Sequence, residues 1–293
     1  HGARSGSTLL MQLLAQNPEN HCTATNDLSL LMAGVQAQWT GCDGFKSQGL
    51  ERLVPRMRGL MRGMIEGFYA DEFNAGKTVF DKSRDWLRQI ELVEEVLEQR
   101  VTVVLCIRDI RDMVASLEAL FRKNAITRPA RNVEQQISGQ TIEDRCKQYL
   151  GKDAMLGMFI SSIKDCFEKG LDDRLIIVPY HCLVNEPRQT IAAVHFDCGL
   201  ETFLCDPDHV EHVTKENDEV HGRPFHVVRD QVDSTAIGRW QGILPQDVAE
   251  WLVNEYPSIQ QLAHGPYRSC RNDSQVIAIR EPQTPSLAFA ETN

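Results

Sequence analysis

This 293-residue chain lacks any pattern of metal ligands, although it contains nine cysteines. The cysteines are scattered, and no C-x-x-C pair or Cys/His group occurs at the spacing of zinc ligands. Their number is odd, and some lie inside apolar runs, as Cys106 does, where a free thiol behaves as a small buried hydrophobe. We therefore expect no metal site, and free thiols in a reducing, cytoplasmic compartment.

Long apolar runs and an excess of positive charge are also absent. No run approaches the length of a membrane span, so we expect no transmembrane helix. The 31 basic residues against 41 acidic residues give a formal net charge of −10. Because the field of such a molecule repels phosphate backbones, we expect no nucleic-acid partner, although a local basic pocket for one small anion is compatible with it.

A loop of small residues, GARSGST at residues 2–8, runs directly into an apolar helical pattern. Such a loop can aim backbone N–H groups at an oxyanion, and the positive end of the following helix adds to the attraction. A Walker A loop would read G-x-x-x-x-G-K-[ST]. Here Ser7 stands where that lysine would be, and the cation is Arg4, inside the loop. The loop therefore predicts a phosphate-rich ligand other than the γ-phosphate of ATP.

Strand-like and helix-like patterns alternate along the chain, which predicts an α/β fold with a mainly parallel sheet flanked by helices. The apolar runs at residues 101–107 and 175–180 are typical of parallel strands covered on both faces, and a shorter strand is expected at 78–80. Helices are expected at residues 7–16, 28–39, 52–69, 86–99, 112–122, 141–169, 188–199 and 245–255, with a polar connection at 21–26 and a loop at 41–49.

The ends of the chain raise two expectations. A phosphate-binding loop of this kind is held by a preceding strand, and the sequence begins at the loop itself. We expect that strand, with any targeting signal, to lie outside this sequence. Within it, we expect one domain over residues 1–267 and a flexible polar tail over residues 268–293. The sequence carries no signal for an oligomeric state.

Polar residues cluster at three places that follow strand positions: residues 2–8, 81–86 and 108–116. Ligands of parallel α/β sheets bind at the carboxyl ends of the strands, so we expect the clusters to share one site. In CIRDIRDMVAS, Arg108 leaves a strand and Ser116 lies in the helix that follows. An arginine and a hydroxyl at this separation can hold one phosphate from two sides.

Together, GARSGSTLL and CIRDIRDMVAS resemble the sulfotransferases that use 3′-phosphoadenosine 5′-phosphosulfate (PAPS), in their bacterial and Golgi-type branch. The resemblance implies a P-loop-like fold and sulfuryl transfer from PAPS to a hydroxyl or amine, without a metal. It implies that Arg108 and Ser116 hold the 3′-phosphate. Tyr180, in the segment LIIVPYHCLVNEP, would contact the adenine. The 5′-phosphosulfate would be held by the front loop, through Arg4, Ser5, Gly6, Ser7 and Thr8.

The same resemblance implies a catalytic role for Lys82 in FDKSRDW, which with Arg4 would neutralise the leaving phosphate. A general base must also lie within hydrogen-bond reach of the acceptor hydroxyl. Asp27 is our candidate, and the alternative is that it only caps the helix that follows it. Four further residues are weaker candidates for the base, and the alternative for each is a purely structural role: Asp81, His181, His221 and His226.

The residues alone are also compatible with two other functions. A P-loop kinase or nucleotide hydrolase would need the Walker lysine that this loop lacks. A nucleotide-binding module without catalytic activity is the third possibility. The acceptor of a sulfotransferase would be a small molecule, a glycan or a peptide, bound by residues 26–69, 123–140 and 205–235.

Overall fold

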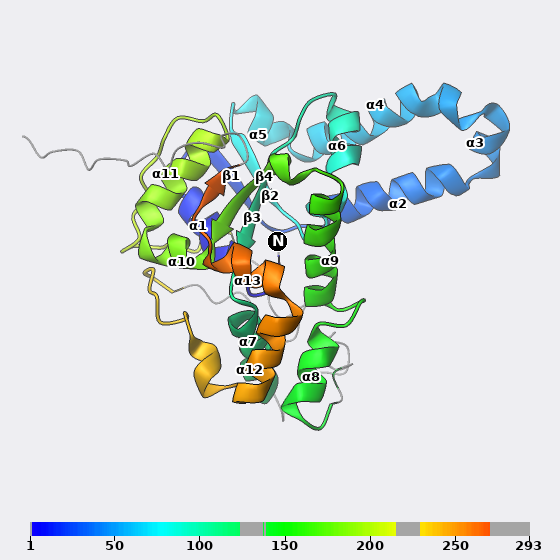
Figure 1. Cartoon of the computed structure of the whole chain (residues 1–293). Coiled ribbons are helices and arrows are strands. Elements are labelled where there is room, and N and C mark those ends of the chain that lie inside the picture. The colour runs from blue at the N-terminus through cyan, green and yellow to red at the C-terminus, as the bar shows by residue number, and fades with distance from the viewer. Residues whose placement is uncertain (1, 124–136, 138, 215–228, 270–293) are drawn as a thin grey trace, which may run out of the picture.

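A computed structural model describes residues 2–123, 137, 139–214 and 229–269 of the chain (Figure 1). Among these residues, the strands form two small sheets flanked by helices. The first sheet pairs β1 (Asn20–Thr25) with β2 (Thr78–Lys82) in parallel. The second has the order β3 (Val103–Ile107), β4 (Leu175–Pro179) and β5 (Arg268–Ser269). Strands β3 and β4 are parallel, whereas β5 is antiparallel to β4. The predicted α/β class is confirmed.

Helices of varied length surround the two sheets. They are α1 (Ser7–Leu14), α2 (Leu28–Gly41), α3 (Asp43–Gln48), α4 (Leu50–Phe68), α5 (Ala70–Asn74), η1 (Trp86–Arg88), α6 (Ile90–Leu97), α7 (Ile110–Lys123), α8 (Ile142–Tyr149), α9 (Met155–Glu168), η3 (Asp172–Arg174), α10 (Tyr180–Asn185), α11 (Pro187–Asp197), η5 (Arg239–Gly242), α12 (Gln246–Glu255) and α13 (Pro257–His264). No helix among the described residues is long and apolar enough to cross a membrane.

The strand pair β3–β4 is covered by apolar side chains on both faces, as its uninterrupted apolar sequence predicts. Leu105 and Ile177 belong to a cluster formed with α7, α9 and α12. Cys106 and Ile176, one position away along each strand, belong to a second cluster formed with α1 and α11. Alternate residues of a strand point to opposite faces, which places these two clusters on opposite sides of the sheet.

Helices α2, α3 and α4 form a hairpin that extends away from the sheets (Figure 1). On α4, Met57, Met61, Met64 and Ile65 pack inward against a cluster that α2 and α6 share. Leu60 does not join this face, since 54% of its surface is exposed. The projecting hairpin leaves the outer face of α4 in solvent.

Several predicted elements differ from the structure. The polar connection expected at residues 21–26 is strand β1, and the loop expected at 41–49 contains α3. Pairing with β2 outweighs the polar character of β1: the Thr23 hydroxyl accepts a hydrogen bond from the Lys82 N–H at 2.8 Å. The helix expected over 141–169 is divided into α8 and α9.

The C-terminal boundary also differs from the prediction. Arg268 and Ser269, which the sequence assigns to a tail, pair with Ile177 and Ile176 of β4. The rest of the predicted tail, residues 270–293, lies outside the described residues. The first two residues assigned to the tail therefore belong to the second sheet.

Candidate active site

The loop at residues 2–6 is a tight turn that only certain residues can form. The N–H and the hydroxyl of Ser5 both donate to the Gly2 carbonyl, at 3.3 and 2.9 Å. Arg4 and Gly6 have φ values of +63° and +101°. A Cβ atom on Gly6 would lie 2.4 Å from Cδ2 of Tyr180, so the position excludes any side chain. Helix α1 then begins at Ser7, with its positive end beside the turn.

The loop lies at the carboxyl end of β3. The Cys106 thiol donates to the Ser5 carbonyl at 3.1 Å, and burial raises the pKa of this thiol to about 12. Cys106 is therefore a neutral packing residue that holds the loop against the strand. Ser5 itself is buried. The loop thus lies beside the carboxyl end of β3, where the cluster at residues 108–116 begins, as we expect for clusters that share one site.

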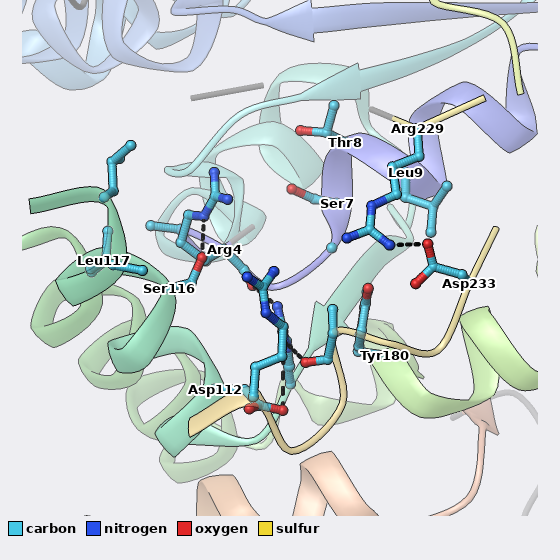
Figure 2. Close-up of a pocket in the computed structure, with 18 of the residues that line it drawn as sticks. Arg4, Ser7, Thr8, Leu9, Asp112, Ser116, Leu117, Tyr180, Arg229 and Asp233 are labelled. Atoms are coloured by element: carbon cyan, nitrogen blue, oxygen red, sulfur yellow. Dashed lines mark hydrogen bonds and ion pairs between the residues drawn. The ribbon is translucent and has the colours of Figure 1, made fainter. Parts of the chain in front are cut away.

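Two cationic side chains, from the loop and from β2, form hydrogen bonds with hydroxyl groups at this loop. The Nε atom of Arg4 donates to the Ser116 hydroxyl on α7 at 2.9 Å, so the two residues contact each other (Figure 2). Lys82, at the end of β2, is 4% exposed, and its ammonium donates to the Thr8 hydroxyl at 3.2 Å. The structure thus brings together four of the residues that the sequence selects from three distant segments.

Arg108 is the most constrained cation of the site. It is 8% exposed and lies 3.6 Å from the Asp112 carboxylate. Its Nη atoms donate to the backbone carbonyls of Arg4, at 3.4 Å, and of Ala236. Its Nε atom is buried and has no hydrogen-bond partner among the described residues. A buried charged donor without an acceptor is costly, which favours an anionic ligand at this position.

Tyr180 lies between the loop and Arg108. Its ring faces the Arg108 guanidinium at 4.5 Å from the ring centroid, and the same ring limits the space at Gly6. Burial raises the pKa of the Tyr180 phenol, so the group is a neutral donor and acceptor. These contacts give Tyr180 a packing role, while its contact with adenine stays a prediction.

Asp112 fixes a distant segment beside the loop. Its carboxylate accepts from the backbone N–H groups of Gly238 and Trp240, at 2.9 and 3.1 Å. This contact holds the segment before and within η5 against α7. Sequence reasoning did not select the cations of this segment, because their position depends on tertiary contacts such as those of Asp112 rather than on a local pattern.

A cavity of about 440 Å³ lies among these elements. Its lining includes Tyr180, Ser116 and Thr8, and apolar residues such as Leu117 and Met155 (Figure 2). Carboxylates are contributed by Asp112 and Asp233. They are outnumbered by the cations of Arg4, Arg84, Arg108, Lys123, Arg229 and Arg239. The cavity is therefore cationic within an acidic molecule, as an anion-binding site requires.

Arg229 is one of the cations that the sequence analysis missed. It forms an ion pair with Asp233, whose pKa is lowered by a hydrogen bond from Thr235 and by Arg229. Figure 2 shows this pair at the side of the cavity where Tyr180 lies. Arg229 lies in the same stretch of chain as Gly238, which Asp112 binds, so this contact helps to hold Arg229 beside the loop.

The candidates for the general base occupy different surroundings. Asp27 is exposed, lies before α2 and accepts no capping hydrogen bond; the Leu28 N–H is bound at 2.8 Å by the Asn26 side chain instead. Asp27 thus occupies the N-cap position of α2, as the capping alternative expects, but its side chain forms no capping hydrogen bond. Asp27 is not among the described residues that line the cavity. Its role as a base stays a prediction.

The other described candidates have structural partners. Asp81 accepts from the side chains of Asn26 at 2.7 Å, Trp86 at 2.9 Å and Tyr69. The imidazole of His181 bonds the Ala263 carbonyl at 3.0 Å. The remaining two, His221 and His226, lie outside the described residues. Among the described residues, no group of three or more His, Cys, Asp or Glu is arranged to hold a metal ion.

Comparison with known proteins adds one finding. The profile described as "Sulfotransferase family" matches residues 2–203. This range contains the loop, Lys82, Arg108, Ser116 and Tyr180. A search of curated proteins found no match.

Proposed function

Because the chain belongs to the sulfotransferase family, it is a transferase that moves a sulfuryl group, and we propose that it takes this group from PAPS. The proposal includes a P-loop-like architecture in which the loop at residues 2–8 holds the 5′-phosphosulfate. In this proposal, the acceptor of the sulfuryl group is a hydroxyl or an amine on a small molecule, a glycan or a peptide. The family favours this reading over a kinase or a nucleotide hydrolase, whose Walker lysine the loop lacks.

The observation that carries the choice of PAPS is the buried Nε atom of Arg108, which lacks a partner among the described residues. Arg108 lies beside the loop rather than in it, so it supports a second anionic group next to the one at the loop. The 3′-phosphate of PAPS is such a group. A planar guanidinium binds phosphate oxygens in a fixed geometry, which a lysine ammonium cannot reproduce.

The loop would hold the 5′-phosphosulfate through backbone N–H groups at the start of α1. Arg4 and Lys82 would stabilise negative charge that develops on the leaving phosphate, since Arg4 belongs to the loop and Lys82 contacts Thr8 in it. PAPS supplies the activated sulfuryl group, while these residues orient it and exclude water. We keep Tyr180 as a contact for adenine and Ser116 as a partner of the 3′-phosphate.

The decisive experiment compares ligands that differ in the 3′-phosphate. Thermal denaturation is measured with 3′,5′-ADP, with 5′-AMP and with ATP–Mg²⁺. We expect 3′,5′-ADP to raise the melting midpoint most, because it engages both anion subsites. Stabilisation by ATP–Mg²⁺ alone would contradict the proposal.

The variant Arg108→Lys tests the assigned subsite. It keeps the positive charge but removes the planar guanidinium, which can donate two hydrogen bonds to one phosphate. Because a charge-assisted hydrogen bond is lost, we expect the affinity for 3′,5′-ADP to fall by about tenfold or more. The affinity for 5′-AMP should stay nearly unchanged. Calorimetric titration measures both. Arg100→Lys is the matched control, because Arg100 pairs with Asp173 on the surface away from the cavity.

Asp27 is retained as the proposed general base. We expect Asp27→Asn to reduce turnover by about 10²-fold or more while the affinity for 3′,5′-ADP stays unchanged, because a base acts on the acceptor and not on the nucleotide. Initial rates with labelled PAPS and an acceptor library measure the turnover. Unchanged turnover in this variant would remove Asp27 from the mechanism.

A further inference from the structure

A buried glutamine on α1 is hydrogen-bonded to a distant segment of the chain. Gln12 is 0% exposed, although its side chain is a polar amide. Its Oε1 atom accepts from the N–H groups of Val213 and Thr214, at 2.7 and 3.2 Å. Its Nε2 atom donates to the hydroxyl and the carbonyl of Thr214, at 2.5 and 3.4 Å. All four hydrogen bonds of which the amide is capable therefore go to two neighbouring residues.

Gln16, four positions later, forms a similar set of contacts. Its Nε2 atom donates to the carbonyls of Asp206 and His209, at 2.9 and 3.0 Å, and its Oε1 atom accepts from the Asp206 N–H at 2.6 Å. The two glutamines thus fix residues 206–214, which we call the docked segment, along α1 and the turn after it. Since α1 begins at the loop of residues 2–8, one helix holds both the docked segment and the loop.

The docked segment in turn holds one wall of the cavity that contains the loop. The Val210 N–H donates to the Asp230 carbonyl at 2.7 Å, and the Val232 N–H donates to the Pro207 carbonyl at 2.8 Å. These bonds join the docked segment to residues 229–233, which we call the wall segment, because all but one of its residues line the cavity. They fix the position of the wall segment only if the docked segment is itself fixed.

The wall segment lies at the end of the cavity that we assign to adenine. Figure 2 shows Arg229 and Asp233 on the side where Tyr180 lies, the residue proposed to contact the base. The phosphates are assigned to the loop and to Arg108 instead. Val232 gives the wall an apolar side chain, which suits the flat face of a base better than a phosphate. A displaced wall segment should therefore weaken contacts with the base and spare those with the phosphates.

We propose that Gln12 is a positioning residue of the nucleotide site, which acts through the docked segment to hold the wall segment against the adenine of bound PAPS. The inference rests on the proposed function, because the adenine belongs to PAPS. Gln12 itself is not among the described residues that line the cavity, so its effect on the ligand is indirect. Asp112 holds the chain after the wall segment through Gly238, so Gln12 fixes one end of this stretch and Asp112 fixes the other.

The variant Gln12→Met tests the proposal, because methionine has a similar length but no amide. It leaves the N–H groups of Val213 and Thr214 without their acceptor, which loosens the docked segment. Calorimetric titration compares 3′,5′-ADP with ribose 3,5-bisphosphate, which carries both phosphates but no base. We expect the affinity for 3′,5′-ADP to fall by about tenfold or more, whereas the affinity for ribose 3,5-bisphosphate should stay nearly unchanged.

Gln89→Met is the matched control. Gln89 is also a buried glutamine, its amide donates to the Ser29 carbonyl at 2.8 Å, and it is not among the described residues that line the cavity. This variant should lower the melting midpoint, while the ratio of the two affinities stays as in the starting chain. A loss of stability alone therefore does not produce the result expected for Gln12→Met.

A double-mutant cycle tests the route of the effect. Val232→Ala removes the apolar side chain that the wall segment presents to the cavity, so it should lower the affinity for 3′,5′-ADP. Because Gln12 acts through this wall, Gln12→Met should have a smaller effect in the Val232→Ala background than in the starting chain. Gln16→Ala loosens the docked segment at its other end, from a less buried position. It should give a smaller loss of the same kind, and it replaces Gln12→Met if that variant does not fold.

Three results would overturn the inference. Equal losses for the two ligands in Gln12→Met and Gln16→Ala, or independent effects of Gln12→Met and Val232→Ala, would do so and leave the proposed function standing. A starting chain that binds ribose 3,5-bisphosphate as tightly as 3′,5′-ADP would do so as well, because the wall segment would then not contact the base. A starting chain that binds neither ligand would contradict the proposed function and the inference with it.

Discussion

Gly6 illustrates how one residue sets the shape of the candidate site. Its φ of +101° and the Tyr180 ring beside it leave no room for a Cβ atom. Arg4, two positions earlier, adopts φ of +63° although it carries a long side chain. Such backbone conformations are costly for residues other than glycine and are held in place by their surroundings. Here those surroundings include the Ser116 hydroxyl and Cys106.

We therefore expect Gly6→Ala to impair the loop more than the fold. The new methyl group must displace Tyr180, which also faces Arg108, so affinity for 3′,5′-ADP should fall by about tenfold or more and stability by about 1–3 kcal/mol. Calorimetric titration and urea denaturation measure the two effects. Gly63→Ala is the control: a Cβ atom there meets open space in α4, and stability should rise by about 0.5–1 kcal/mol. Equal affinities for Gly6→Ala and the starting chain would refute this reading.

The residues that sequence could identify are those attached to a strong local pattern. Arg108 and Ser116 follow an apolar strand, and both line the cavity as expected. Their individual contacts could not be predicted, because the Arg4–Ser116 hydrogen bond joins residues 112 positions apart. Arg229 was missed for the same reason: tertiary contacts, among them those of Asp112 with Gly238 and Trp240, bring its segment to the loop.

At the scale of elements, the sequence predicted strands that have an apolar pattern, and it missed a strand whose formation depends on pairing with a distant segment. Strands β3 and β4 are apolar and buried, and the sequence predicted both. Strand β1, NHCTAT, is largely polar, and its structure depends on parallel pairing with β2 from Asn20–Thr78 to Thr25–Lys82. A pairing between segments more than fifty residues apart leaves no periodic signal in either.

The junction of α7 with α8 depends on a buried ion pair. Glu118 on α7 is fully buried and accepts from Arg145 on α8 at 2.6 and 2.8 Å, and from Arg122 at 2.8 Å. Burial alone would raise the pKa of this carboxyl, but the hydrogen bonds from Arg145 and Arg122 hold it below its usual value. Removing the negative charge leaves a largely buried guanidinium without its partner.

Glu118→Gln should therefore destabilise the protein by about 3 kcal/mol near neutral pH. A carboxyl whose pKa is lowered in the folded state stabilises that state above its unfolded pKa, near 4.5, and this contribution is lost as the pH falls through the folded value. The difference between the two proteins should thus shrink below about pH 4.5. Urea denaturation at several pH values measures it. Glu143→Gln, which breaks an exposed pair with Lys147, should cost at most about 0.5 kcal/mol.

At the scale of the whole molecule, two electrostatic effects oppose each other. The formal net charge is −10, which repels an anionic nucleotide from a distance. The cavity, however, is lined by cations from α7, the loop and the segment before η5. Salt screens interactions over a Debye length of about 10 Å at 0.1 M, so it weakens both the distant repulsion and the attraction at short range. The sign of the salt dependence shows which effect is larger.

We expect the local cations to dominate, because contacts at hydrogen-bond distance involve far larger energies than charges spread over the surface. The affinity for 3′,5′-ADP should therefore fall as NaCl rises from about 50 to about 500 mM, and the slope should be smaller for 5′-AMP, which carries one phosphate fewer. Calorimetric titration at four salt concentrations measures both slopes, with adenosine as the uncharged control. An affinity that rises with salt would mean that the −10 net charge governs binding and that the cavity cations do not contact the phosphates.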